Sequence, residues 1–131
     1  APATKAWKDA WQVTERLIVA TRDEVRAGGG RFLLLSIPIG IQANPDPEVR
    51  KRLMRDLHVD DLWYPETRTR EFAEREKVDA ITLGRTFQSY AESNQAYFYG
   101  FKNTRLGSGH LNENGHRLIG ESLAKHLCQS R

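Results

Sequence analysis

The sequence predicts an α/β protein in which helices alternate with the strands of a parallel sheet. A helical pattern of apolar residues over positions 7–25 ends at three glycines, and an apolar run, Phe32–Ile37, follows at once. A second short run, Val78–Leu83, comes after further helical patterns and is itself followed by two more. This order is typical of α/β proteins with right-handed crossovers. With 131 residues, the chain is expected to form a single α/β unit.

The first predicted helix is amphipathic. Residues on one stripe recur at alternating steps of four and three, and small or apolar residues widen the stripe; together they are Trp7, Ala10, Trp11, Val13, Thr14, Leu17, Ile18, Ala20, Thr21 and Val25. This spacing predicts a helix of about five turns that packs on an apolar surface. The glycines at positions 28–30 are expected to end it.

The two predicted strands do not make a complete sheet. Phe32–Ile37 is apolar on both faces, which predicts a strand covered on both sides. Two such strands alone would leave open edges. Either Tyr97–Phe101 adds a third strand, or another polypeptide pairs with the free edge of Phe32–Ile37. That polypeptide would be an N-terminal fragment of the same domain or a second copy of the chain.

Four further helices are predicted. One covers Glu48–Leu57, with Asp46 as its cap and Pro47 at its first position. The next begins at Asp60 or Asp61 and runs to Lys77, and another covers Thr86–Ala96. Asn112 caps the closing helix, whose apolar residues are Leu118, Ile119, Leu123 and Leu127.

The composition argues against several classes of partner. The 20 Lys and Arg residues are interleaved with 17 Asp and Glu residues, which indicates a solvated surface and no nucleic-acid-binding face. The longest mainly apolar run, Phe32–Ile41, is much shorter than the roughly 20 residues of a membrane span. The single cysteine, Cys128, excludes an internal disulfide and a cysteine-rich zinc site.

The most specific segment for chemistry is Gly107–His116. Gly107 and Gly109 allow sharp backbone turns, so His110 is expected on a loop just before a helix. Ligand sites of open α/β sheets form on such loops. With an orienting partner, an imidazole there can accept a proton from a nucleophile at neutral pH. We therefore predict that His110 is a general base; the alternative is a loop histidine that only caps or hydrogen-bonds.

This segment resembles the last sequence block of the SGNH (GDSL-type) hydrolases. Gly109-His110-Leu111-Asn112, then Gly115-His116 and an amphipathic helix, match that block, which carries the catalytic base at its first histidine. The order and spacing of the preceding elements resemble the C-terminal half of the family's domain. The resemblance implies a flavodoxin-like three-layer α/β/α sandwich, with this chain as its C-terminal part. It also implies serine-dependent hydrolysis or acyl transfer of a small-molecule or carbohydrate ester, with no cofactor and no metal.

Two departures from the family pattern affect this interpretation. The family's Gly-Asp-Ser nucleophile and the glycine and asparagine of its oxyanion hole have no counterpart here, so the nucleophile is expected outside this chain. The position three residues before the histidine, commonly an aspartate, is Gly107. Ser108, a backbone carbonyl or Glu113 are the alternatives for orienting His110. Gly107 also favours a second interpretation, a non-catalytic α/β binding or assembly module that has lost the site.

Other polar residues carry weaker predictions. His116 is expected to pair with the preceding loop, and its spacing from His110 does not fit a zinc site. His58 and His126 are interpreted as surface or packing residues. Ser36 and Ser89 lack the sequence context of a nucleophile.

Four residues form one further hypothetical group, the lining of an acyl or sugar subsite: Gln42, Trp63, Tyr97 and Tyr99. The alternative is that the aromatic residues among them only anchor turns.

Overall fold

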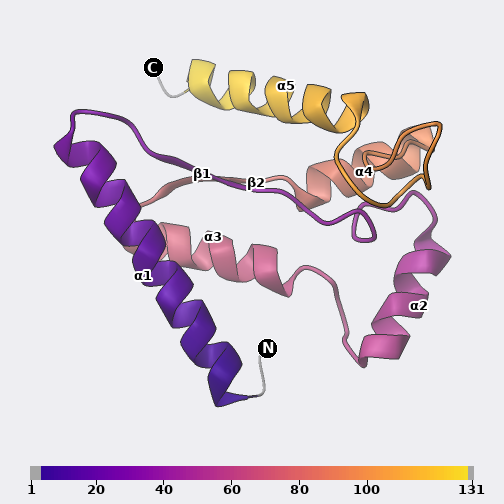
Figure 1. Ribbon diagram of the computed structural model, residues 1–131, viewed down its shortest axis with the longest axis horizontal. Coiled ribbons are helices and arrows are strands. Elements are labelled where there is room, and N and C mark those ends of the chain that lie inside the picture. Colours follow the sequence, from indigo (N-terminus) through magenta and orange to yellow (C-terminus); the bar gives the residue numbers. More distant parts are fainter. Residues whose placement is uncertain (1–3, 130–131) are drawn as a thin grey trace. The chain divides into compact units, whose positions relative to one another are not determined.

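The computed structural model describes residues 4–129, and in this range five helices and two strands alternate along the chain (Figure 1). The elements are α1 (Lys5–Ala27), β1 (Leu33–Ser36), α2 (Pro47–Leu57), α3 (Tyr64–Glu76), β2 (Asp79–Thr82), α4 (Gly84–Asn94) and α5 (Glu113–Gln129). The strands β1 and β2 pair as a two-stranded parallel sheet. The predicted mixture of helices with a parallel sheet is confirmed at this level, in a helix-rich form.

The chain divides into two compact units, each made of two segments. Among the described residues, the first unit contains residues 4–35 together with Tyr64–Ile81, and so holds α1, α3 and most of both strands. The second unit contains Ser36–Trp63 and residues 82–129. It therefore holds α2, α4, α5 and the loop that carries His110.

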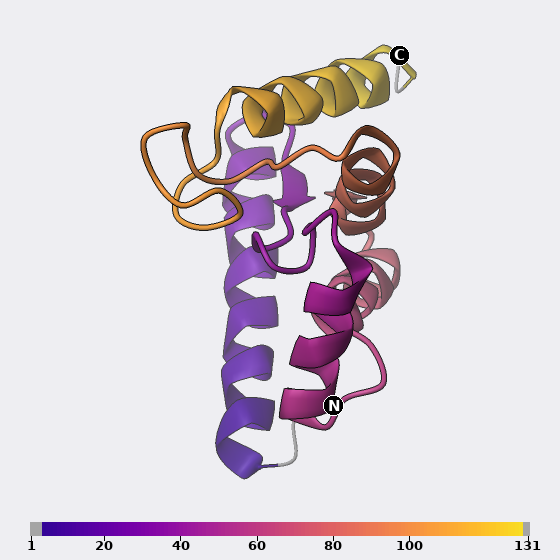
Figure 2. The ribbon, with the colours of Figure 1, turned by 90° about the vertical axis from the view of Figure 1, so that its right-hand side faces the viewer.

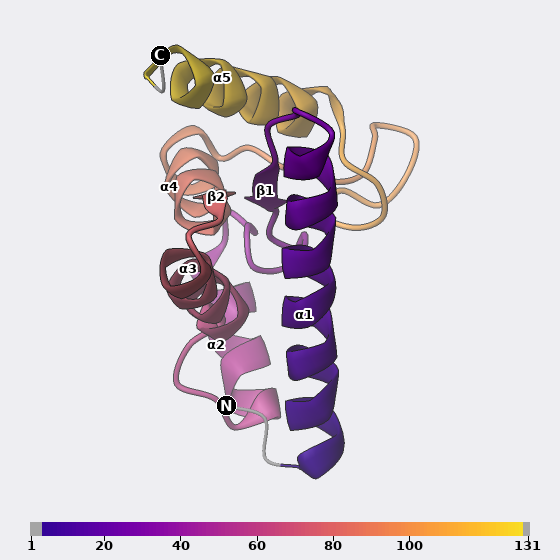
Figure 3. The ribbon, with the colours of Figure 1, turned by 90° about the vertical axis from the view of Figure 1, so that its left-hand side faces the viewer.

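In the first unit, α1 packs against α3 through one face. Ile18 and Val19 of α1 contact a small buried core that includes Phe72 of α3. Glu15 of α1 forms ion pairs with Arg68, at 2.8 Å, and with Arg75, at 3.0 Å. Apolar contact and charge pairing thus fix the same side of this long indigo helix, which Figure 3 shows along its full length.

The end of α1 agrees with the sequence prediction, the helix is longer than the predicted five turns or so, at 23 residues, and only part of its predicted stripe is packed by the described residues. Gly28 caps the helix, and Gly29 takes a left-handed φ of +77°. No residue of α1 is buried, and the side chains of Trp7, Val13 and Leu17 are 64%, 55% and 62% exposed. The wide apolar stripe exceeds the one face that α3 and its neighbours cover.

The predicted third strand does not form within residues 4–129. Tyr97–Phe101 makes only an isolated antiparallel bridge, between Tyr99 and Leu111. The reason is that its backbone groups are engaged by the loop that follows: Gly107 donates to the Tyr99 carbonyl, and Gly100 donates to the His110 carbonyl. Consequently every residue of β1 is only partly buried by the described residues, and the cover expected on both faces of this strand stays a prediction.

The second unit has an aromatic core that fixes the start of α5. Phe87 of α4 and Phe98 are completely buried, with ring centroids 4.4 Å apart. Leu118 of α5 is also buried. At Gly115, a Cβ atom would lie 2.8 Å from the Phe98 carbonyl oxygen, so α5 approaches this backbone closely. The connecting loop, orange in Figure 2, folds back on itself before α5 begins.

The predicted helices of the middle of the chain are present with shifted starts. Asp46 caps α2 as predicted, because its carboxylate accepts the Glu48 N–H at 2.8 Å. The helix α3 begins later than predicted, since Asp61 instead accepts the Trp63 N–H and closes a turn. The helix α4 begins at Gly84, two residues before Thr86. None of the helices described here is both long enough and apolar enough to cross a membrane.

Candidate functional site

His110 lies on the loop between α4 and α5, with its side chain exposed to solvent. Its backbone carbonyl accepts a hydrogen bond from the Gly100 N–H at 2.9 Å, and Asn112 N–H donates to the Phe98 carbonyl at 2.9 Å. These bonds join the two arms of the loop on either side of His110. The backbone of His110 is therefore held in place while its imidazole stays accessible.

Asn112 fastens this loop to the start of α5. Its side-chain nitrogen donates to the carbonyls of Tyr97, at 2.9 Å, and Gly100, at 3.0 Å. Its side-chain oxygen accepts the Gly115 N–H at 3.2 Å. The predicted helix cap is confirmed, and the same amide also braces the loop, which the sequence pattern alone did not indicate.

Gly107, at the position where the resemblance expects an aspartate, has a backbone role. Its φ is +82°, in the left-handed region that favours glycine. A Cβ atom here would lie 3.2 Å from a ring carbon of Tyr97, and a Cβ atom at Gly40 would lie 2.4 Å from the Gly107 carbonyl oxygen. The segment that follows β1 and the segment that precedes His110 therefore meet backbone to backbone, and both positions need a residue without a side chain.

None of the proposed orienting groups is hydrogen-bonded to the His110 ring in the part of the chain that the structure describes. Within residues 4–129, no hydrogen bond or ion pair links the imidazole to Ser108, to Glu113 or to a backbone carbonyl. The site as described consists of an exposed imidazole on a fixed backbone, without the partner that would hold its tautomer.

The structure does not bring the other predicted polar residues to His110. The side chain of His116 is exposed on α5, and only its backbone N–H bonds the preceding loop, at the Asn112 carbonyl, 3.0 Å away. His58 ends α2 with a left-handed φ of 52°, and Ser89 is exposed on α4. In residues 4–129 there is no group of three or more His, Cys, Asp or Glu side chains that could hold a metal ion.

The hypothetical subsite of Gln42, Trp63, Tyr97 and Tyr99 does not gather around one hollow, because Trp63, Tyr97 and Tyr99 each line a different one. Gln42 is engaged in its own turn, where it accepts the Ile39 N–H and donates to the Leu62 carbonyl. Trp63 is buried under the guanidinium of Arg85, 4.9 Å from its ring centroid. Trp63 therefore anchors a turn, as the alternative interpretation had it.

A hollow of about 560 Å³ lies beside the His110 loop. It is lined mostly by aliphatic side chains and backbone from two segments, Ile37–Ile41 after β1 and Arg105–Gly109 before His110, together with Asn44, Val49 and Tyr99. The Tyr99 hydroxyl donates a hydrogen bond to the Pro38 carbonyl. Burial raises the pKa of Tyr99, because the phenolate would lose hydration. Sequence reasoning missed this hollow, although the repeated isoleucines of Ile37–Ile41 were its signal.

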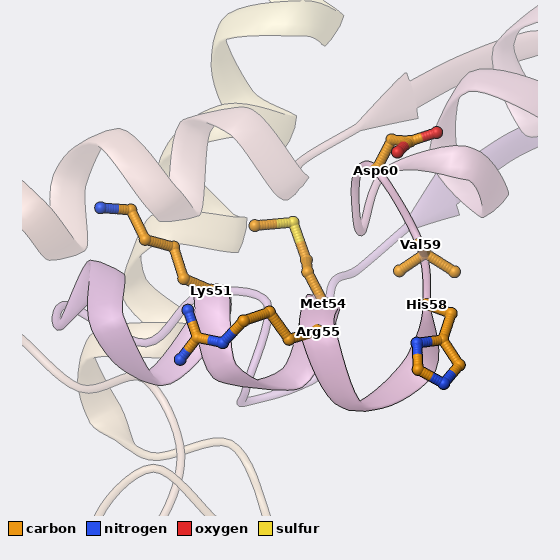
Figure 4. A pocket seen from close by; sticks show the side chains of 6 residues that line it. All are labelled: Lys51, Met54, Arg55, His58, Val59 and Asp60. Atoms are coloured by element: carbon orange, nitrogen blue, oxygen red, sulfur yellow. The ribbon is translucent and has the colours of Figure 1, made fainter.

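A second hollow, at the end of α2, does not present a convergent set of groups. Lys51, Met54, Arg55, His58, Val59 and Asp60 line about 550 Å³ (Figure 4). The polar ends of Lys51, His58 and Asp60 point in different directions, and Lys51 is paired with Glu48 at 2.8 Å. These side chains are typical of a solvated surface.

Comparisons with family models, with curated proteins and with solved structures found no match for this chain. The case for a function therefore rests on the His110 segment and on the geometry around it.

Proposed function

We propose that this chain is part of an SGNH-like ester hydrolase or acyl transferase and that it supplies His110 as the general base. The observation that carries the proposal is the exposed imidazole of His110 on a loop whose backbone is hydrogen-bonded on both sides and ends in the Asn112 cap. A general base must hold a fixed place and still reach its substrate. The Gly109–Asn112 motif, which resembles the family's last block, supports the same role.

In this mechanism His110 acts first as a general base and then as a general acid. The imidazole takes the proton from a serine hydroxyl as that oxygen attacks the ester carbonyl, and it then gives the proton to the leaving alcohol. Water or an acceptor hydroxyl, activated in the same way, releases the acyl group from the serine. Backbone and amide donors stabilise the oxyanion of each tetrahedral intermediate. The serine and these donors belong to the part of the domain that precedes the segment described here.

The same proposal extends to the sheet. We expect β1 and β2 to be two strands of a larger, flavodoxin-like three-layer sandwich, completed by an N-terminal fragment of the same domain or by a second copy of the chain. The partly buried residues of β1 support this idea, because a strand with apolar side chains on both faces is stable when it is covered.

Hydrolysis of p-nitrophenyl acetate tests the proposal. The 131-residue chain alone should be a poor esterase, whereas the longer polypeptide that includes the residues encoded before Ala1 should turn the ester over. If the 131-residue chain hydrolyses the ester in a way that is lost in His110→Ala but kept when every serine is replaced, the serine mechanism is wrong.

A non-catalytic binding or assembly module is the second candidate. It is favoured by Gly107 at the usual aspartate position and by the missing hydrogen bond to the His110 ring. Absence of turnover in the longer polypeptide, with a folded His110 loop, would favour this module over the enzyme.

A further inference from the structure

Amide side chains gather around a hollow of the second unit that His110 does not line. The end of α4, the connecting loop and the start of α5 enclose about 740 Å³, within the range of roughly 300–1,000 Å³ that small-molecule sites occupy. We call it the amide hollow, after the five amide side chains in its lining: Asn94, Gln95, Asn103, Asn112 and Asn114.

Three of these amides are fixed by bonds to backbone carbonyls. The side-chain nitrogen of Asn94 donates to the Tyr90 carbonyl at 2.9 Å, and that of Gln95 donates to the Glu92 carbonyl at 3.0 Å. Asn112 braces the loop as described above. Among the described residues, nothing donates a hydrogen bond to the side-chain oxygens of Asn94 and Gln95. The hollow therefore presents hydrogen-bond acceptors in fixed positions.

The other two amides, Asn103 and Asn114, are open to a ligand. Both residues are exposed, and within residues 4–129 no hydrogen bond engages either side chain. A primary amide offers donors and an acceptor side by side, and a hydroxyl group is itself both a donor and an acceptor. A ligand rich in hydroxyl groups could therefore satisfy these amides together with the fixed acceptors.

Aromatic rings line the same hollow as the amides. Phe101 is 45% exposed, and Tyr97 is partly buried. The face of an aromatic ring is electron-rich, so it attracts the positive edges of C–H groups. A sugar ring carries C–H groups on its faces and hydroxyl groups around its rim. Aromatic surface beside open amides is complementary to both parts of such a ring.

The charges and the apolar content of the lining argue against other small ligands. Lys102 and Glu113 are its charged residues, one of each sign, whereas nucleic acids and other polyanions are bound by several cations. Leu106 is its one large aliphatic side chain, so an alkyl chain would find little apolar surface. The ligand that fits is uncharged and polar.

The backbone of the lining does not suit an extended peptide. A peptide strand binds by pairing with free backbone N–H and carbonyl groups. Here the Gly100 N–H donates to the His110 carbonyl, and the Asn112 side chain occupies the carbonyls of Tyr97 and Gly100. The hydrogen-bonding groups left for a ligand are mainly those of side chains.

We propose that the amide hollow binds a neutral saccharide. Tyr97 is the one residue that it shares with the hypothetical subsite of the sequence analysis. Because His110 does not line the hollow, the binding is independent of the proposed function of His110.

Titration of the 131-residue chain with neutral disaccharides tests this inference. Cellobiose, maltose and diacetylchitobiose are added separately while the backbone amide shifts are followed by NMR. At least one should give saturable shifts centred on residues 94–103 and 112–114. Glycerol, which has hydroxyl groups but no ring face, should give none. Absence of saturation with all three disaccharides, or shifts centred elsewhere, would overturn the proposal.

A matched pair of variants separates the hollow from general stacking on exposed aromatic rings. Phe101→Ala should weaken binding roughly twofold to tenfold, because the sugar loses its stacking surface. Phe101 is 45% exposed, and its bonds with Thr104 use only backbone atoms of Phe101, so the loop can keep its fold. Trp7→Ala removes a 64% exposed ring from α1, outside the hollow, and should leave binding unchanged. Equal effects of the two variants would contradict the assignment.

A second variant tests the amides. Asn103→Ala removes a side chain without a partner in the described residues, so the fold should keep its stability. Loss of its hydrogen bonds to the sugar should weaken binding roughly twofold to tenfold. Unchanged affinity in both Asn103→Ala and Phe101→Ala would overturn the proposal.

Failure of this inference and failure of the proposed function give different results. Saccharide binding that is sensitive to Phe101→Ala, without ester hydrolysis in the longer polypeptide, supports the amide hollow and counts against the enzyme. Ester hydrolysis without saccharide binding supports the enzyme and overturns the inference.

Discussion

At the scale of single residues, Gly107 and Gly109 hold left-handed backbone in different surroundings. Their φ values are +82° and +86°, but a Cβ atom at Gly107 would press on the Tyr97 ring, whereas one at Gly109 would meet nothing within 4 Å. Gly109→Ala should therefore cost about 1–2 kcal/mol of unfolding free energy from backbone strain alone. Gly107→Ala should lower the free energy of unfolding further, by up to about 3 kcal/mol, because its Cβ atom also presses on the Tyr97 ring. Urea denaturation measures both changes.

Gly120→Ala is the control for these two variants. Gly120 lies in α5 without a positive φ and has open space around it. There alanine should stabilise the chain by about 0.5–1 kcal/mol, because it favours the helix. Equal effects at Gly107 and Gly109 would mean that contact with Tyr97 does not restrict the loop.

The backbone of Gly107 also bears on how His110 is oriented. The resemblance to the SGNH pattern, in which this position is commonly an aspartate, would by itself favour a higher kcat for Gly107→Asp. The left-handed φ and the contact with Tyr97 oppose any side chain at this position. The structure therefore favours the outcome in which this variant does not gain activity and the loop keeps its glycine for geometric reasons.

Tyr99 gives a pH-dependent contribution to stability. Burial raises the pKa of its hydroxyl, so the folded chain keeps the phenolic proton at a pH where the unfolded chain loses it. The contribution is complete below the ordinary tyrosine pKa of about 10 and is lost as the pH rises from there through the higher pKa of the folded state. Unfolding free energy measured between neutral and alkaline pH should fall more steeply for the natural chain than for Tyr99→Phe. Parallel pH curves would contradict the assignment.

At the scale of elements, Arg50 ties α2 to α4 inside the second unit. Its side chain is buried, donates to the Asn44 carbonyl and pairs with Glu92 of α4. Arg50→Met keeps the apolar stem but removes charge-assisted hydrogen bonds, so it should lower the free energy of unfolding by about 1.5–3 kcal/mol. The loss is no larger because Glu92 is half exposed and water can hydrate its carboxylate. Thermal unfolding should show a lower Tm.

Lys51→Met is the matched control for Arg50→Met. Lys51 is the next residue of α2, and both it and its partner Glu48 are exposed. Solvent screens such a pair, so the Tm should change little. A decrease in Tm as large as that of Arg50→Met would show that general loss of surface charge, and not the buried arginine, is responsible.

Features that depend on residues close together in the sequence could be predicted from the sequence. The caps at Asp46 and Asn112 and the glycine end of α1 depend on neighbouring backbone groups, and the sequence shows those neighbours. The conformation of Tyr97–Phe101 depends on hydrogen bonds to residues up to fifteen positions away, such as those to Gly107 and Asn112, which no local pattern shows. The hollow beside His110 was missed for the same reason, since its two walls are far apart in the sequence.

At the scale of the whole molecule, the two-stranded sheet leads to a prediction about assembly. Within residues 4–129, β1 pairs only with β2, and an isolated pair of strands is marginally stable in water. Another polypeptide should therefore pair with the free edge of β1. The free energy of unfolding of a domain is only roughly 5–15 kcal/mol, and an open edge would lower it. Sedimentation at micromolar concentration should show association. A monodisperse monomer with cooperative melting would contradict this expectation.

The central claim, that His110 is the general base, is tested most directly by kcat for p-nitrophenyl ester hydrolysis in the longer polypeptide. His110→Ala is compared with His116→Ala, which removes a second exposed histidine six residues away. We predict that His110→Ala lowers kcat by several orders of magnitude, as loss of a triad member does, while His116→Ala leaves it within a small factor of the natural value. Similar kcat values for His110→Ala and the natural protein would contradict the claim.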